Sequence, residues 1–269
     1  MTIAELTALL EEWAPAASAE SWDNSGLQIG RPETTVTGVV VALDLTPAVI
    51  QEARRLGANL VITHHPMFFS PIKQITPATL VGSMALQLAE SGLAHYAIHT
   101  NLDAAREGVS FALARKLGLN HLEFLQERAD DSETGLGTVG EYDEPIPIEA
   151  FLARIADALA VNGVRHVSSP GMRVRRVAVC GGSGSSFLAL ALASAADAYV
   201  TADVKYHQFF DALNPDGTPA LAYVDVGHYE SEAMTEELLV AFLDRVTDGI
   251  PVHRTAETTS PIQTWIRRV

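Results

Sequence analysis

Two adjacent histidines follow an apolar run in the stretch Ile62-Thr63-His64-His65-Pro66. Imidazole is the commonest metal-binding side chain, and an apolar run of this kind is typical of a buried strand. Successive side chains of a strand point to opposite sides, so His64 and His65 would serve two neighbouring metal ions more naturally than one. The alternative is one hydrogen-bonded structural histidine beside one exposed histidine.

Acidic residues follow two other histidines at a spacing of four. His99 precedes Asp103, and His228 precedes Glu232. Residues four apart lie on the same face of a helix, and a carboxylate near the start of a helix interacts favourably with its dipole. The alternative for each acid is an ordinary first-turn residue, and for His228 it is a surface position.

These residues together form a mixed set of imidazole and carboxylate donors, which suits zinc, manganese or iron(II). The five candidate ligands are His64, His65, Asp103, His228 and Glu232. Either Glu232 or Asp103 could bridge two ions about 3.5–4 Å apart, as carboxylates do in two-metal hydrolytic sites. Two such ions would supply hydroxide at neutral pH, with His99 and His207 as candidate proton carriers. A buried structural role is the alternative for His99.

A glycine-rich stretch, Gly181-Gly182-Ser183-Gly184-Ser185-Ser186, follows the apolar residues that end at Cys180. Backbone N–H groups at the start of a helix can bind an anion, so Gly182, Ser183, Gly184 and Ser185 are candidate anion contacts. Phe187 occupies the third glycine position of a dinucleotide fingerprint, and the lysine of a P-loop is missing. The alternative is a tight strand-to-helix turn without a ligand.

The elements that would carry these residues occur twice. Apolar strands at 39–41 and 58–63 are matched 138 residues later by strands at 177–179 and 196–201. A third strand in each half, at 95–98 and 221–224, precedes the histidine and acid pair. Each half opens with a predicted helix, at 4–12 and 148–159, and closes with another, at 107–117 and 232–246. Alternating strands and helices predict an internally duplicated α/β fold whose largely parallel or mixed sheets are covered by helices.

This pattern predicts a first α/β repeat at 1–125, a linker at 126–147 and a second α/β repeat at 148–269. The linker is acidic and rich in glycine and proline, with room for a strand around 136–141. In parallel sheets ligands collect beyond the carboxyl ends of the strands, and the candidate histidines occupy that position. We therefore expect one composite site, because the second repeat has Ala202-Asp203 where the first has His64-His65.

The bulk composition limits the function further. The formal charge of −15 disfavours binding to extended nucleic acid, since an acidic surface repels phosphate backbones. Cys180 is the only cysteine, which excludes an intrachain disulfide and a thiolate cluster. The first residues do not resemble a signal peptide, and no apolar run is long enough to span a bilayer. We expect a cytoplasmic protein without a membrane anchor.

Six motifs in this order along the chain resemble the NIF-three-like family, whose members are often called GTP cyclohydrolase I type 2 homologs. The motifs are Trp22-Asp23-Asn24, Thr63-His64-His65-Pro66, His99-Thr100-Asn101-Leu102-Asp103, Gly181-Gly182-Ser183-Gly184-Ser185, Asp203-Val204-Lys205-Tyr206-His207 and Gly227-His228-Tyr229-Glu230-Ser231-Glu232. The resemblance implies intertwined halves, two divalent metal ions per chain in a cleft, and a toroidal homohexamer. It gives the same five metal ligands. Some members carry an extra domain between the halves, for which the linker leaves no room.

Two functions fit these observations. The first is a metal-dependent hydrolase that acts on a small-molecule substrate, GTP or another nucleotide-like compound. The second is a metal-holding hexamer without catalysis, which would present surfaces to interaction or regulatory partners. No motif in the sequence selects a guanine base.

Overall fold

The computed structural model describes residues 1–128 and 131–265, and it forms two compact units. The first unit consists of Met1–Asn101 and Glu236–Val269, and the second consists of Leu102–Thr235. The chain therefore leaves the first unit, builds the second and returns. This division differs from the predicted division into repeats, because each half of the sequence contributes elements to both units.

The helices that close the two repeats are exchanged between the units. Helix α5 (Val109–Lys116), from the first half, packs in the second unit, where Leu113 and Leu117 share a core with Phe151. Helix α9 (Thr235–Val246), from the second half, packs almost entirely in the first unit. There Phe242 stacks on Trp13 with ring centroids 4.7 Å apart. Because each half of the sequence contributes its closing helix to the other unit, the two halves are intertwined, as the resemblance implies.

The first unit is built on a five-stranded sheet with strand order β1-β4-β3-β2-β11. The strands are β1 (Gly26–Ile29), β2 (Val39–Ala42), β3 (Leu60–Thr63), β4 (Ala94–Ala97) and β11 (Val252–Arg254). The strands from β4 to β11 run parallel, and β1 adds an antiparallel edge. Strands β2, β3 and β4 confirm the predicted strands, and their residues are all buried, as expected for a sheet covered on both faces.

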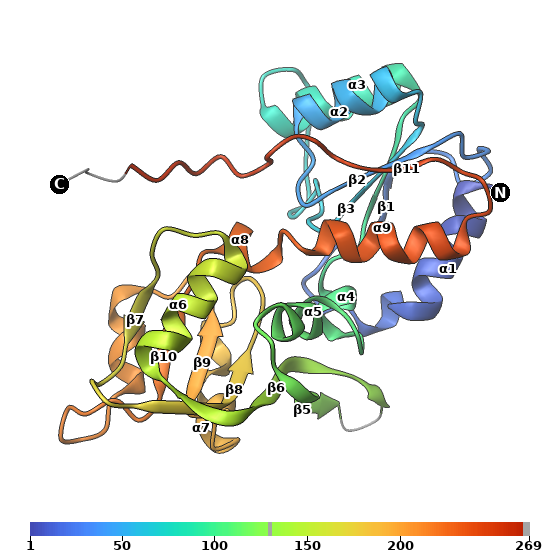
Figure 1. The fold of residues 1–269 in the computed structure, drawn as a ribbon. Coiled ribbons are helices and arrows are strands. Elements are labelled where there is room, and N and C mark those ends of the chain that lie inside the picture. The colour runs from blue at the N-terminus through green and yellow to red at the C-terminus, as the bar shows by residue number, and fades with distance from the viewer. Residues whose placement is uncertain (129–130, 266–269) are drawn as a thin grey trace. The chain divides into compact units, whose positions relative to one another are not determined.

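Helices α1 (Ile3–Trp13), α2 (Pro47–Leu56) and α3 (Leu80–Ser91) belong to the same unit. Helix α2 begins where the side chain of Thr46 accepts a hydrogen bond from the Val49 N–H, and it ends at the left-handed Gly57. Helices α2 and α3 lie side by side (Figure 1) and share an apolar core with strand β3. Helix α4 (Thr100–Ala104) follows His99 and carries the chain from the first unit to the second.

The second unit contains a six-stranded mixed sheet with strand order β5-β6-β8-β9-β10-β7. The strands are β5 (Asn120–Arg128), β6 (Asp131–Pro147), β7 (Arg165–Val167), β8 (Arg173–Val179), β9 (Ala198–Thr201) and β10 (Ala222–Asp225). Strands β8, β9 and β10 are parallel, and the others pair antiparallel. Most of the segment expected as a linker, 126–147, lies in the β5–β6 hairpin and pairs with β8.

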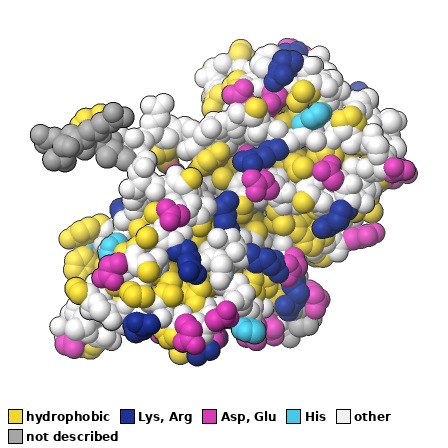
Figure 2. All heavy atoms as spheres, viewed as in Figure 1, with side chains coloured by type: hydrophobic (Ala, Val, Ile, Leu, Met, Phe, Trp, Pro, Cys, Tyr) yellow, Lys and Arg dark blue, Asp and Glu magenta, His cyan; other side chains and the backbone are white. Residues whose placement is uncertain are grey.

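Four α-helices accompany this sheet: α5, α6 (Ile148–Leu159), α7 (Leu188–Ala193) and α8 (His228–Glu232). Short 3-10 helices occur at Ala16–Ser18, Ser185–Phe187 and Tyr206–Ala212. The predicted helix at 232–246 is two helices, because α8 ends at Glu232 before α9 begins. Within 1–128 and 131–265, no helix combines the length and apolar character needed to cross a membrane. On the face shown in Figure 2, acidic and basic side chains are interspersed rather than gathered by sign.

Candidate metal centre

Three histidines gather at the carboxyl ends of two neighbouring parallel strands in the first unit. His64 and His65 follow β3, and His99 follows β4 shortly after its end. Each offers a ring nitrogen, and these nitrogens lie within 4.8 Å of one another. His64 is fully buried, and His99 is nearly so. The structure therefore brings His99, expected as a proton carrier, into the same cluster as two predicted ligands.

The three rings are each held through Nδ1 by an oxygen acceptor. His64 Nδ1 lies 2.9 Å from the Ile98 carbonyl oxygen, and His65 Nδ1 lies 2.8 Å from Asp44 Oδ1. His99 Nδ1 lies 2.7 Å from Asp23 Oδ1. A carbonyl or carboxylate oxygen can only accept, so Nδ1 carries the proton and the neutral ring has its lone pair on Nε2. Metal-binding histidines are commonly anchored in this way.

Among the oxygen acceptors that hold these histidine rings, the Asp23 carboxylate accepts the most hydrogen bonds. Its side chain is fully buried and accepts hydrogen bonds from the Ser25 hydroxyl at 2.8 Å and the Thr100 hydroxyl at 2.6 Å. Burial alone would raise the pKa of Asp23, but the hydrogen bonds from His99, Thr100 and Ser25 together lower it far below its usual range. Asp23 therefore stays ionised and fixes both the orientation and the tautomer of His99.

A second set of donors occurs in the second unit, on and near helix α8. His228 and Glu232 share this helix, and Nε2 of His228 lies 3.0 Å from Glu232 Oε2. His228 Nδ1 lies 2.8 Å from Asp203 Oδ2, so this ring is anchored like the other three. A carboxylate oxygen of Asp103 lies within 4.8 Å of one of Glu232. Of the two arrangements that a spacing of four allows, the structure has His228 and Glu232 on the same helix.

Gly182 leaves the space in which the Glu232 carboxylate lies. Its φ is +61°, and a Cβ added there would lie 2.1 Å from Glu232 Oε1 and 3.3 Å from His228 Nε2. Only glycine combines this backbone conformation with the absence of a side chain. The space that the Glu232 carboxylate occupies therefore requires a glycine at position 182, a requirement that depends on a contact between distant residues.

The N–H groups of this turn are largely used inside the second unit. Gly182 donates to Ser231 Oγ at 2.9 Å, and Gly184 donates to Thr201 Oγ1 at 3.0 Å. Ser185 Oγ accepts a hydrogen bond from Gln208 at 3.0 Å. These bonds favour a tight structural turn over the predicted anion contact at Gly182, Ser183, Gly184 and Ser185, although the contact itself stays a prediction.

His207, the other predicted proton carrier, is exposed on the 3-10 helix Tyr206–Ala212. Its ring lies 5.2 Å from the Tyr206 ring and 6.4 Å from the Phe210 ring, measured between centroids. These neighbours are themselves more than half exposed. The role of His207 in proton transfer stays a prediction.

Comparison with known proteins identifies the family. The model of the Duf34/NIF3 (NGG1p interacting factor 3) family matches residues 1–261. The chain belongs to this family. The recognition made from the six motifs is thereby confirmed.

Similar proteins are found among both curated sequences and solved structures. A protein of Streptomyces coelicolor named "GTP cyclohydrolase 1 type 2 homolog" is 36% identical over 266 residues, which covers 95% of this chain and 91% of the relative. A crystal structure of a Staphylococcus aureus hypothetical protein superposes with a TM-score of 0.90 at 30% identity, covering 98% and 99% of the two chains. A Staphylococcus aureus relative with the same curated name is 26% identical over 369 aligned positions, covering 98% of this chain and 100% of the relative. That relative therefore contains residues without a counterpart among the 269 of this chain.

The donors of this Duf34/NIF3 protein fit a divalent metal ion. Imidazole nitrogens and carboxylate oxygens are the ligand types that zinc, iron(II) and manganese accept. His228 Nε2 and Glu232 Oε2 lie 3.0 Å apart, so one ring nitrogen and one carboxylate oxygen of the accepted ligand types lie side by side. Burial, reinforced by the charges of Asp103 and Glu232, raises the pKa of the Cys180 thiol. The thiol therefore stays protonated and does not add a thiolate to the donor set.

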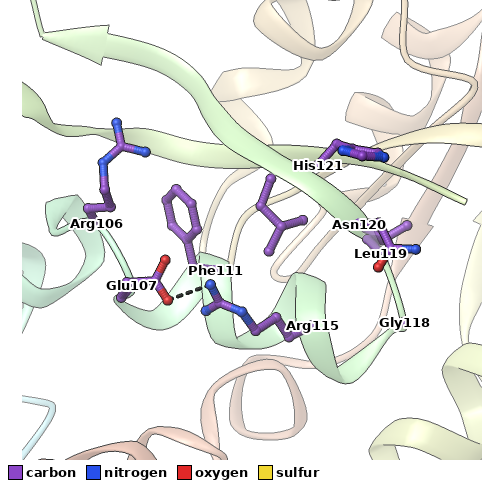
Figure 3. A pocket seen from close by; sticks show the side chains of 9 residues that line it. Arg106, Glu107, Phe111, Arg115, Gly118, Leu119, Asn120 and His121 are labelled. Atoms are coloured by element: carbon purple, nitrogen blue, oxygen red, sulfur yellow. Dashed lines mark ion pairs between the residues drawn. The ribbon is translucent and has the colours of Figure 1, made fainter.

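A pocket of about 490 Å³ in the second unit lies apart from these donors. It is lined by side chains of helix α5 and strand β5, among them Phe111, Arg115 and Leu122 (Figure 3). Arg115 forms an ion pair with Glu107, marked in the figure. None of its lining residues is a candidate metal ligand, so its shape carries no information about the metal centre.

Proposed function

We propose that this Duf34/NIF3 protein is a metal-dependent hydrolase whose two divalent ions are held by His64, His65, Asp103, His228 and Glu232. The observation that supports this most is the anchoring of the histidines: each of His64, His65 and His228 has Nδ1 fixed by an oxygen acceptor, as is common for histidines that bind a metal through Nε2. Packing alone gives no reason for three histidines to share this arrangement. The identity of the ions, zinc, iron or manganese, is left to experiment.

Helix α4 connects His99 and Asp103 along the chain. His99 directly precedes this helix, and Asp103 lies inside it. Residues four apart on a helix are separated by about 6 Å along its axis. The short connection keeps Asp103 near His99 along the chain, and Asp103 or Glu232 would supply the carboxylate that bridges the ions.

Different residues of the chain would activate the water, orient the ligands and move protons. Bound divalent ions would polarise the substrate and activate water at neutral pH. The orientation of the ligand rings would be fixed by hydrogen bonds from their Nδ1 atoms to Asp44, Asp203 and the Ile98 carbonyl. His99 would move a proton at Nε2, since the ionised Asp23 holds the ring by its other nitrogen and fixes its orientation. If His99 instead binds a metal, the proton carrier must be another residue, and His207 is the candidate.

The names of the curated relatives suggest the substrate class. Several are called "GTP cyclohydrolase 1 type 2 homolog", so GTP or a nucleotide-like compound is the first substrate to test. A toroidal homohexamer and a cytoplasmic location complete the proposal. They come from the motif resemblance and from the composition of the chain.

A second candidate function is a metal-holding protein without catalysis that binds partner proteins. The exposed aromatic side chains of Tyr206 and Phe210, whose ring centroids lie 5.5 Å apart, favour it, because aromatic residues are enriched at protein interfaces. The family description, which speaks of an interacting factor, points the same way.

One set of variants tests the hydrolase. Metal analysis should find two divalent ions per wild-type chain, and one or none in His64→Ala/Asp103→Ala. Glu232→Ala should abolish turnover of GTP, or of a panel of phosphoesters, nucleotides and amides, with the oligomer intact. Glu149→Ala removes an exposed carboxylate of helix α6 in the same unit and serves as the control. Full metal content in the double variant would refute the ligand assignment. A fully loaded wild type without turnover on any substrate would favour the second candidate.

A further inference from the structure

A pocket of about 390 Å³ in the first unit lies beside the histidine cluster, between the segments 22–24 and 68–72. We infer that this pocket binds a flat aromatic or heteroaromatic ring of the substrate against Trp22 and Phe69. The inference rests on the proposed function, since it assigns the pocket to the substrate of the adjacent metal centre.

The pocket contains two large aromatic side chains that the protein leaves uncovered. Trp22 and Phe69 are each 57% exposed, and their ring centroids lie 5.7 Å apart with planes tilted by 47°. Exposed apolar surface that lines a concavity, instead of being scattered, is typical of ligand-binding sites. Two tilted rings at this spacing offer one face and one edge to a third ring, the arrangement that aromatic groups favour.

The same two rings contact the candidate metal centre. The Trp22 centroid lies 6.0 Å from the His99 ring, and the Phe69 centroid lies 6.2 Å from it, both in edge-on geometry. His99 in turn is grouped with His64 and His65. A ring bound against Trp22 and Phe69 would therefore place its substituents next to the imidazole donors.

The two segments that line the pocket are held together by hydrogen bonds. Asn24 Nδ2 donates to the Phe68 carbonyl oxygen at 2.8 Å, and the Phe68 N–H donates to Gln28 Oε1 at 3.3 Å. Gln28 Nε2 also donates to the Asn24 carbonyl oxygen at 2.6 Å. These bonds fix the loop that carries Phe69 against the segment that carries Trp22. Ligand binding would therefore cost little conformational entropy in this loop.

The lining defines the class of ligand. Among the described residues, no lysine or arginine lines the pocket, and the Asp23 carboxylate is already engaged by His99, Thr100 and Ser25. The pocket therefore recognises a ring by its shape and its π face and gives no attraction to a phosphate chain. A nucleotide would bind through its base, and its anionic part would depend on the metal ions.

The test compares two neutral lactams with one skeleton, the flat quinolin-2(1H)-one and its saturated analogue octahydroquinolin-2(1H)-one. Binding to the full chain is measured by ligand-observed NMR, with and without added Zn²⁺. The flat compound should bind at least about 10-fold more tightly, and Trp22→Ala and Phe69→Ala should each weaken it by about 10-fold. Trp265→Ala removes an exposed tryptophan outside the lining residues and should leave its binding unchanged.

The outcomes separate this inference from the proposed function, because metal content is measured on the same samples. Equal binding of the two lactams, or wild-type binding by Trp22→Ala, would overturn the inference even if two ions are bound. A change of oligomeric state in Trp22→Ala without a change in ring binding would also overturn it, in favour of a protein contact. Loss of ring binding at unchanged metal content in Trp22→Ala is the supporting result.

Discussion

Gly182→Ala tests whether the Glu232 carboxylate has to occupy its present position. The added Cβ would lie 2.1 Å from Glu232 Oε1, whereas ordinary contact begins at 3.4 Å. The carboxylate would have to retreat by about 1.3 Å, the difference of these two distances. Metal–ligand distances tolerate deviations of only about 0.2 Å, so the displacement should remove Glu232 from a coordination sphere.

We expect Gly182→Ala to weaken binding of Zn²⁺ or Mn²⁺ by at least about 10- to 100-fold. The backbone strain of a left-handed alanine costs about 1 kcal/mol by itself, and this cost has to be separated from the effect on the metal. Gly57→Ala is the matched control. Its φ is +69°, close to the +61° of Gly182, and its Cβ would meet nothing within 4 Å.

The assay is calorimetric titration of metal into protein that has been stripped with EDTA, together with urea unfolding of the stripped protein. Both variants should lose a similar free energy of unfolding, but only Gly182→Ala should lose metal affinity. Wild-type affinity in Gly182→Ala would show that Glu232 is not a ligand at this position. An equal loss of affinity in Gly57→Ala would show that the effect is one of general stability.

Two further predictions concern the first unit. Burial lowers the pKa of His95 to about 3, below the value near 6.5 in the unfolded chain. Protonation of His95 therefore favours the unfolded state, and the free energy of unfolding decreases as the pH falls from 6.5 towards 3. This residue should lower the free energy of unfolding of the wild type by up to about 1.4 kcal/mol per pH unit between pH 6 and pH 4.5. Urea unfolding of His95→Asn should show a free energy of unfolding that depends less steeply on pH. Identical pH dependences of the two proteins would contradict the prediction. Leu243→Ala should lower the free energy of unfolding by about 2–5 kcal/mol, because Leu243 of helix α9 is fully buried, whereas a loss no larger than that of the exposed Asp244→Ala would argue against a core position.

The elements with strong local patterns could be predicted from the sequence. Strands β2, β3 and β4 are short apolar runs, and helix α6 has both its predicted ends, since its apolar residues recur at helical spacing. The strand expected around 136–141 lies within β6, whereas other weakly patterned strands could not be predicted. Strand β11 has only three residues and pairs with β2, which lies more than 200 positions earlier. Such a strand is stabilised by pairing with its neighbouring strand, so a local sequence pattern cannot indicate it.

The sequence by itself determined which side chains could bind a metal, and it determined that His228 and Glu232 share a helix face, because the helical repeat is a local property. Only the tertiary structure decided how the donors are held. Asp44 lies 21 residues from His65, Asp23 lies 76 from His99, and Asp203 lies 25 from His228. It also decided why Gly182 is a glycine and which unit receives helix α9. These features are contacts between distant parts of the chain, which folding creates and which no spacing in the sequence records.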